Sequence, residues 1–352
     1  MRQPSRRSLL AAALLALAGG ARAQRNWREV AVPFYTLDAF AAGEALAQRA
    51  RADDFAAAAA RLTQSLQAYC AGPPQAGQAQ APRSAWAGAA HRWDALAALA
   101  TGPLIARRSA RSMDFMPPRP AMLARAIAAA PRTPAEMQAI GAPARGLPAL
   151  EWLLWRTPGL APGSAECAYA LAVAQDLQRE ADALAAAARQ RVAEPAVGEA
   201  AQARLVEVIN QWVGGVEQLR WAFMRKPLDM AATRGAEPEF PRAASGQTAA
   251  TWAARWSTLR DAAVLGNRPV PVPGQAALPL ETLLRGRGLN PLADRLLAAV
   301  DATGQTLADL RSDDAARVRA AAEALGALSH FVQEALAPAL DVNMGFSDAD
   351  GD

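Results

Sequence analysis

The sequence contains few of the side chains that most often hold metals or act in catalysis. Two of its 352 residues are histidine and two are cysteine, which excludes a histidine-rich or cysteine-rich metal site. His91 and His330 both lie off the apolar stripes of the helical patterns around them, so we expect both to be exposed. The His-Glu-x-x-His, Gly-x-Ser-x-Gly, EF-hand and glycine-rich phosphate motifs are absent as well. The sequence therefore favours no familiar catalytic class.

Apolar runs long enough to span a bilayer, which needs about 20 residues, are also absent. The apolar run at 9–18 is too short; it follows three arginines and precedes Ala21-Arg22-Ala23. This is the pattern of a cleaved export signal, so we expect removal of residues 1–23 and a mature periplasmic protein without a transmembrane segment. The pair Arg6-Arg7 also resembles a twin-arginine signal, which leaves the general (Sec) and the twin-arginine routes open.

An excess of charge of one sign is missing from the expected mature chain. Lys226 is the only lysine, and arginine carries the remaining positive charge. Removing the four arginines of residues 1–23 from the 37 basic residues leaves 33, against 33 acidic residues. The high calculated pI of 9.6 is thus a property of the precursor. It gives no reason to expect nucleic acid as a partner.

Strand patterns are not indicated. We find no period-two alternation bounded by turn signals, whereas apolar residues recur at helical spacing through most of the chain. Loop-like segments rich in proline and glycine separate these patterns. They lie at 71–82, 116–120, 157–164, 266–275 and 286–291. The patterns between them suit antiparallel bundle helices, so we predict an all-α fold of two antiparallel helical-bundle domains.

The chain is long enough for two domains of ordinary size. We place the first bundle at 24–195 and the second, with an acidic C-terminal tail, at 196–352, because the segment 189–201 is the best candidate for a connection. Each half contains a helical pattern with two tryptophans. These pairs are Trp86/Trp93 and Trp252/Trp256. An ancient duplication explains the pairs, and so does coincidence.

Cys70 and Cys167 are the only cysteines. Export permits a disulfide, and the two residues fall at the end of one helical pattern and the start of another. We therefore predict a Cys70–Cys167 bond, with two buried free thiols as the alternative.

Glu151 is an acid in a strongly apolar stretch, PARGLPALEWLLWRTPG at 143–159. Pro148 is tolerated in the first turn of a helix, where its missing N–H costs no hydrogen bond. If the helix begins at Pro148, Glu151 lies in the first turn, where the helix dipole favours a carboxylate. A position at the start of a helix thus explains Glu151 without any binding or catalytic role. The alternatives are that Glu151 binds a ligand or that it remains from a metal site.

Four stretches in this order resemble the imelysin family, which is also classed as a peptidase family of bacterial envelope proteins. They are SAWAGAAHRWDALAALATGP at 84–103, GLPALEWLLW at 146–155, CAYALAVAQDL at 167–177 and GFSDADGD at 345–352. The resemblance covers the chain from about residue 28 to its end. It implies two helical bundles that face a shared cleft, with the motif Gly-x-His-x-x-Glu at that cleft.

Carried onto this sequence, Gly146 matches the glycine of the motif and Glu151 the glutamate, but Pro148 stands in place of the histidine. Residues three apart share a helix face, so histidine and glutamate at this spacing can meet one metal ion. Proline has no ligand atom in its side chain. We therefore expect no transition metal at this motif.

The expected ligand-binding cleft consists of the motif positions and their neighbours. These are Glu151, Arg145, Gly146, Pro148, Trp86 and Trp152. Glu151 is expected to contact a basic or hydrogen-bonding partner, with Arg145 as the nearest candidate and Arg225 and Arg242 as alternatives. The two tryptophans are expected to form apolar walls.

The resemblance favours a non-catalytic periplasmic binding protein linked to iron or haem uptake, as members of the family often are. The expected partner is an unidentified small ligand or an iron-uptake component, and iron or haem are the only cofactors that the resemblance implies. A metallopeptidase with Glu151 as base or ligand is one alternative, although the missing histidine weighs against it. A structural or interaction protein is another, and the sequence leaves open whether the chain is an enzyme.

Overall fold

The computed structural model describes residues 32–73, 79–156 and 160–345. Within these ranges every regular element is a helix and no strand occurs, which confirms the all-α prediction. The described part contains no helix that combines the length and the apolar character needed to cross a membrane. The predicted signal at 1–23 and the acidic end of the tail at 346–352 lie outside the described residues.

The first part of the chain forms a long helix, a series of short helices and a second long helix. These are α2 (Leu37–Cys70), α3 (Gln80–Ala97), α4 (Pro103–Ala106), α5 (Ser109–Met113), α6 (Pro120–Ala129), α7 (Pro134–Ala139), the 3₁₀ turn η2 (Ala142–Ala144), α8 (Gly146–Trp155) and α9 (Ala165–Ala193). In the second part, two helical rods each contain a short π-helical segment. The elements are α10 (Glu199–Arg220), η3 (Trp221–Arg225), α11 (Lys226–Arg234), α12 (Thr248–Ala263), α13 (Leu280–Gly286), α14 (Asn290–Leu307), α15 (Ala315–Phe331), η4 (Val332–Leu336) and α16 (Ala337–Ala339).

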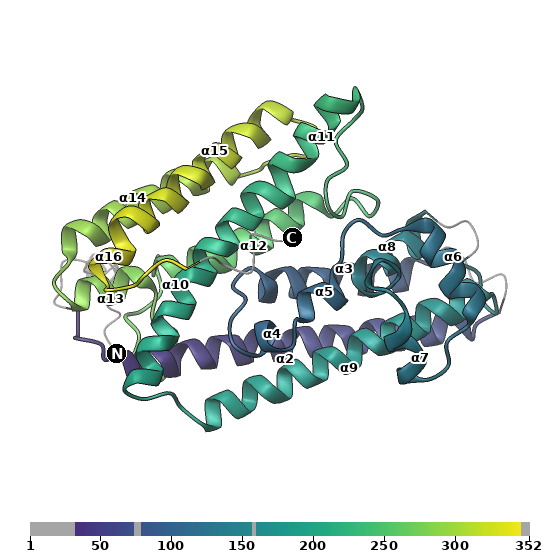
Figure 1. Cartoon of the computed structure of the whole chain (residues 1–352), viewed down its shortest axis with the longest axis horizontal. Helices are drawn as coiled ribbons and strands as arrows, with labels where there is room; N and C mark the ends of the chain where they lie inside the picture. The colour runs from purple at the N-terminus through teal and green to yellow at the C-terminus, as the bar shows by residue number, and fades with distance from the viewer. Residues whose placement is uncertain (1–31, 74–78, 157–159, 346–352) are drawn as a thin grey trace, which may run out of the picture.

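The long helices α2 and α9 lie side by side along one edge of the molecule (Figure 1). Side-chain caps define their starts: Thr36 accepts a hydrogen bond from the Ala39 N–H, and Ser164 accepts one from the Cys167 N–H. Each cap provides a partner for an N–H that the helix itself cannot pair.

The predicted disulfide is confirmed. Cys70 at the end of α2 is bonded to Cys167 in the first turn of α9, with a Cα–Cα distance of 5.7 Å. The bond closes a loop with a sequence separation of 97 residues. For a loop of this length the chain-entropy model gives a stabilisation of about 4 to 5 kcal/mol as an upper bound. The bond holds together the two helices on which the first half is built.

The buried apolar side chains form two separate clusters. One contains residues between Ala52 and Ala188, and the other contains residues between Leu205 and Val342. Four buried residues from the first half belong to the second cluster. They are Tyr35, Phe40, Ala98 and Leu99. The start of α2 and the segment after α3 thus anchor the second half on the first. The domain boundaries given above and the ancient duplication stay predictions.

The two helices with paired tryptophans, α3 and α12, pack against each other where the halves meet. The Thr258 hydroxyl on α12 donates a hydrogen bond to the carbonyl of Ala95 on α3, at 3.0 Å. Nearby, α10 approaches the segment after α3 at Gly215, where any Cβ would overlap the carbonyl oxygen of Ala98. The halves therefore touch through backbone as well as side chains.

The π segment η3 directly continues helix α10. Pro227 has no N–H to donate to the carbonyl of Phe223 four residues earlier, so the regular α pattern cannot continue there. The indole N–H of Trp252 on α12 donates to this carbonyl instead, at 3.1 Å. This hydrogen bond thus ties η3 to α12 and holds the backbone that carries the Phe223 ring.

Candidate functional site

A large cleft lies between the two halves, with a volume of about 1680 Å³. The first half lines it with the end of α3, with α4 and α5, with the segment 114–120 and with α8. The second half lines it with α10, η3, α11 and the segment 236–244 that leads toward α12. An opening of this kind, built by elements from both halves, is where ligand sites of helical proteins commonly lie.

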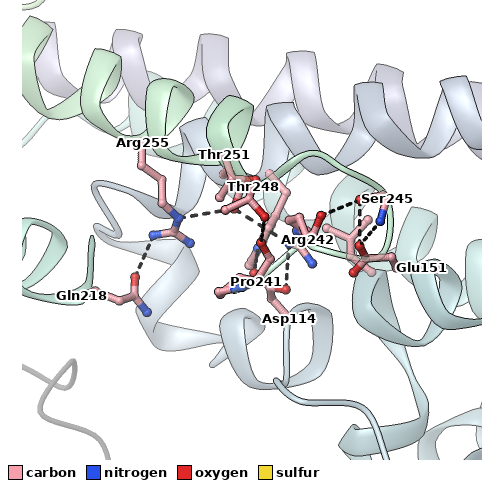
Figure 2. Close-up of polar contacts among 12 residues, drawn as sticks. Asp114, Glu151, Gln218, Pro241, Arg242, Ser245, Thr248, Thr251 and Arg255 are labelled. Carbon is pink, nitrogen blue, oxygen red and sulfur yellow. Dashed lines mark hydrogen bonds and ion pairs between the residues drawn. The ribbon is translucent and has the colours of Figure 1, made fainter. Parts of the chain in front are cut away.

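The wall of the cleft contains a buried cluster of charged side chains from both halves (Figure 2). Asp94 on α3 is fully buried, and its Oδ1 lies 3.3 Å from Arg255 Nε and 3.8 Å from Arg242 Nη2. Its Oδ2 accepts a hydrogen bond from the Thr251 hydroxyl at 2.9 Å. Arg242 Nη2 also lies 2.8 Å from Asp114 Oδ1. Two carboxylates of the first half are thus matched with two guanidinium groups of the second.

The neighbours of this cluster hold its members in place. Trp93 donates its indole N–H to Asp114 Oδ2 at 2.9 Å. Arg255 Nη1 donates to Gln218 Oε1 at 2.8 Å, and its guanidinium lies 3.9 Å from the centre of the Phe223 ring. A guanidinium over an aromatic face is favourable when both are desolvated. The ring that η3 positions therefore supports a buried cation.

Burial changes the proton affinities of the cluster. Loss of water raises the pKa of Asp94 above its ordinary value, although Arg242 and Arg255 oppose this change. Burial likewise lowers the pKa of Arg255. Burial also acts to lower the pKa of Arg242, but the carboxylates of Asp114, Asp94 and Glu151 outweigh it and raise the pKa. Arg242 is therefore held in its charged form by three acids.

Arg242 is in a strained backbone conformation. Its φ of 64° is in the left-handed region, which costs a non-glycine residue roughly 1–2 kcal/mol. The Gln247 N–H donates to its carbonyl at 3.0 Å, and the Thr248 hydroxyl donates to the carbonyl of Pro241 at 2.9 Å. These bonds fix the turn that points the Arg242 side chain at the first half (Figure 2). Strain that is maintained in this way is frequent at binding sites.

Glu151 lines the cleft and is 6 % exposed. Its Oε1 accepts hydrogen bonds from the Ser245 N–H at 2.9 Å and from the Ser245 hydroxyl at 2.7 Å (Figure 2). Helix α8 begins at Gly146, two residues before Pro148, so Glu151 is its sixth residue. The first-turn explanation of Glu151 is therefore wrong, because the helix-dipole effect is confined to the first turn. Glu151 instead connects the two halves.

The other predicted cleft residues are divided between the cleft and its surroundings. Pro148 and Trp152 line the cleft. Gly146 is buried with a φ of 71°, and a Cβ there would overlap the Met113 carbonyl. Its missing side chain lets α8 start directly against the end of α5, next to Asp114.

Arg145 and Trp86 are placed differently from the expectation. Arg145 donates to the carbonyl of Met137 at 3.0 Å and lies 3.6 Å from Asp176, so the contact of Glu151 is with Ser245 and not with Arg145. Trp86 is fully buried behind the cleft lining, and the Arg242 guanidinium lies 5.6 Å from its ring centre. Trp86 therefore supports Arg242 and does not form a wall.

Of the alternative partners for Glu151, Arg242 belongs to its electrostatic environment, whereas Arg225 pairs with Asp229 at 3.6 Å on its own helical rod. The two histidines, His91 and His330, are both exposed on helices, as expected.

Sequence reasoning missed most of the buried cluster, although two members left a signal. Asp94 directly follows Trp93 and Arg255 directly precedes Trp256, so both lie at the edges of the tryptophan stripes of their helices. A charge on an apolar stripe must be paired if it is buried. Asp114, Arg242 and Ser245 lie in irregular segments, where no periodicity marks them.

Glu151→Ala is expected to lower the free energy of unfolding by about 2 kcal/mol, the range of charge-assisted hydrogen bonds. The full cost of breaking a buried ion pair is not expected, because Arg242 keeps Asp114 and Asp94 as counter-charges. Urea unfolding of the mature protein measures the difference. Glu237→Ala, which removes an exposed acid of the same cleft, is the control and should change stability by less than about 0.5 kcal/mol. Equal effects of the two variants would show that the Ser245 contacts contribute nothing.

Fold and site together define an all-helical protein with two apolar cores and a charged cleft between them. The sequence matches the model of the imelysin family (Peptidase M75) over residues 48–340. The chain therefore belongs to the imelysin family, and the resemblance noted from the sequence is confirmed.

Two solved structures share this fold. One is an imelysin-like protein from Psychrobacter arcticum 273-4, with a TM-score of 0.73 and 22% identity, covering 90% of this chain and 100% of that one. The other, from Parabacteroides distasonis ATCC 8503, is described by its name as an iron-regulated protein A precursor; it has a TM-score of 0.65 and 14% identity, covering 86% of this chain and 95% of that one. No curated protein matches the sequence. At these identities the two structures establish the fold alone.

Proposed function

We propose that this protein is a non-catalytic binding protein that holds a small ligand in the cleft between its two halves. The observation that carries the proposal is the state of the acids at the cleft. Asp94 and Asp114 are paired with arginines, and Glu151 accepts two hydrogen bonds from Ser245. Carboxylates whose oxygens already accept from donors within the protein orient and stabilise a binding surface, and this favours a binding role.

The residues of the cleft do not fit a resident transition metal. On the resemblance of the sequence to the family motif, Pro148 stands where a histidine is expected, and its side chain offers no ligand atom. Among the described residues no three histidine, cysteine, aspartate or glutamate side chains are grouped to hold an ion. The metallopeptidase alternative would need such a group to activate water.

We further propose that the protein acts outside the cytoplasm and takes part in iron or haem acquisition. The export signal expected at 1–23 supports the location. Membership of the imelysin family and the name of the iron-regulated Parabacteroides protein support the link to iron. In this proposal iron or haem is the substance that is taken up, and it is not a catalytic group that stays bound to the protein.

Native mass spectrometry and metal analysis of protein purified from the periplasm test the proposed function. We expect a non-covalent ligand at a stoichiometry of about one, and no stoichiometric zinc or iron bound to the protein alone. In Ala110→Trp a large side chain is placed in the cleft lining, so the ligand should be lost. The matched control is Ala249→Trp, at an exposed position of α12 outside the lining.

Two results would contradict the proposed function. Stoichiometric zinc or iron that disappears in Glu151→Ala would revive the metallopeptidase alternative. Ligand retention in Ala110→Trp at the level of Ala249→Trp would show that the ligand binds elsewhere.

A further inference from the structure

The opening of the cleft carries more positive charge than its neighbours neutralise. The side chains of four basic lining residues have no hydrogen-bond or ion-pair partner among the described residues. They are Arg108 and Arg111 at α5, and Lys226 and Arg234 of α11. All four are exposed, and they come from both halves. Guanidinium and ammonium groups left without counter-charges around a concave surface attract anions.

The acids of the lining do not offset this charge. Asp114 is paired with Arg242, Glu151 is held by Ser245, and Glu239 lies 3.3 Å from Arg156. Glu237 is the one acidic lining residue without a partner in the described part of the chain. A cation entering the cleft would thus meet four uncompensated positive groups and a single uncompensated negative one.

Arg242 adds unused donors behind the opening. Its side chain is fully buried in the cleft wall, and its Nε and Nη1 atoms have no hydrogen-bond partner among the described residues. A buried guanidinium with unmade hydrogen bonds is costly. An oxygen acceptor that reached these two nitrogen atoms would supply the hydrogen bonds that they lack.

The remaining lining is apolar and partly accessible. Trp152 and Met116 of the first half face this space, and so do Phe223 and Met230 of the second. Met230 is 39 % exposed, so its side chain is accessible to a ligand in the cleft. Aromatic and thioether surfaces of this kind bind flat or irregular apolar groups.

We propose that the cleft binds a small amphipathic organic anion. In this arrangement the apolar body lies on the aromatic and methionine surfaces, and the oxyanion groups face Arg108, Arg111, Lys226 and Arg234. The inference rests on the proposed function, because it names the chemical class of the ligand for the same cleft.

A matched pair of dyes tests this inference on the mature protein. 8-Anilinonaphthalene-1-sulfonate has an aromatic body and a sulfonate, and N-phenyl-1-naphthylamine is its neutral counterpart. We expect the sulfonate to bind at one site per chain, to be excluded by Ala110→Trp, and to bind more tightly than the neutral dye. Its affinity should fall as salt rises from about 0.05 to about 0.5 M, because salt screens exposed charges.

Charge variants separate the electrostatic from the apolar contribution. The double variant Arg111→Gln/Arg234→Gln removes one cation from each side of the cleft and should weaken sulfonate binding at least about tenfold, which is 1.4 kcal/mol. Binding of the neutral dye should be unchanged. The control is Arg61→Gln/Arg319→Gln, which removes two exposed arginines of α2 and α15 outside the lining and should leave both dyes unaffected.

Equal affinities in the two double variants, or tighter binding of the neutral dye, would overturn the inference. The proposed function has a separate outcome. If mass spectrometry identifies a neutral or cationic ligand that Ala110→Trp displaces, the binding function stands and the anion inference is wrong. If neither dye nor any co-purified ligand responds to Ala110→Trp, both are wrong.

Discussion

Asp94→Asn is expected to lower the free energy of unfolding by about 3 to 5 kcal/mol. Asparagine has nearly the same shape and keeps an acceptor for the Thr251 hydroxyl, so the substitution removes mainly the charge. Arg255 loses its carboxylate partner in a fully buried position, and Arg242 loses one of its two ion-pair partners while Glu151 stays in its electrostatic environment. An uncompensated buried guanidinium is far more costly than a lost surface contact. Urea unfolding followed by circular dichroism measures the change.

Asp54→Asn is the matched control, because it removes the same charge from an exposed pair. Asp54 lies 3.0 Å from Arg92, and the side chains are 58% and 55% exposed. Its effect should stay below about 1 kcal/mol. Adding Arg255→Gln to Asp94→Asn should cost much less than the sum of the single variants, because the two residues share one interaction. Similar losses for Asp94→Asn and Asp54→Asn, or simple additivity with Arg255→Gln, would show that the cluster does not act as a unit.

Gly215→Ala is expected to destabilise the protein by about 3 kcal/mol, at the upper end of overpacking effects. In helix α10 the new methyl group would overlap the carbonyl oxygen of Ala98, and a backbone atom cannot rotate away as a side chain can. Relief requires separation of the two halves at the floor of the cleft. We therefore expect a lower melting temperature and, in addition, weaker sulfonate-dye binding, since Gly215 also lines the cleft.

Gly88→Ala is the same substitution in a helix interior, and its expected effect on the free energy of unfolding has the opposite sign. A Cβ at Gly88 in α3 meets no atom within 4 Å. Alanine is favoured over glycine in a helix by roughly 0.5 to 1 kcal/mol, so this variant should be slightly more stable than the wild type. If Gly215→Ala were also neutral or stabilising, the close approach of α10 to Ala98 would not exist in solution.

The fold class was predictable because it depends on local patterns. Helical periodicity is repeated in almost every segment, and proline and glycine mark the breaks between them. The disulfide was predictable for the same reason, since Cys70 and Cys167 fall at the ends of two such patterns. Helix α8 starts two residues before Pro148. Gly146, whose positive φ forms the turn into the helix, allows this earlier start.

The site was predictable only in part, and the reason is visible in Glu151. Its motif position marked it as a cleft residue, but its partner stayed open among Arg145, the nearest in sequence, and the alternatives Arg225 and Arg242. The structure pairs it with Ser245, which is 94 residues away along the chain. Arg145 turns back toward Met137 and Asp176 within the first half.

The sequence by itself determined an all-helical chain of the imelysin family and a bond between its two cysteines. These properties follow from residue type and spacing within single helices. Only the tertiary structure decided which charges meet: Arg255 lies 161 positions from Asp94. Arg242 reaches the cleft from an irregular turn with a positive φ. Periodicity can show that a helix face is buried, but the partner of a buried charge depends on how two distant faces pack.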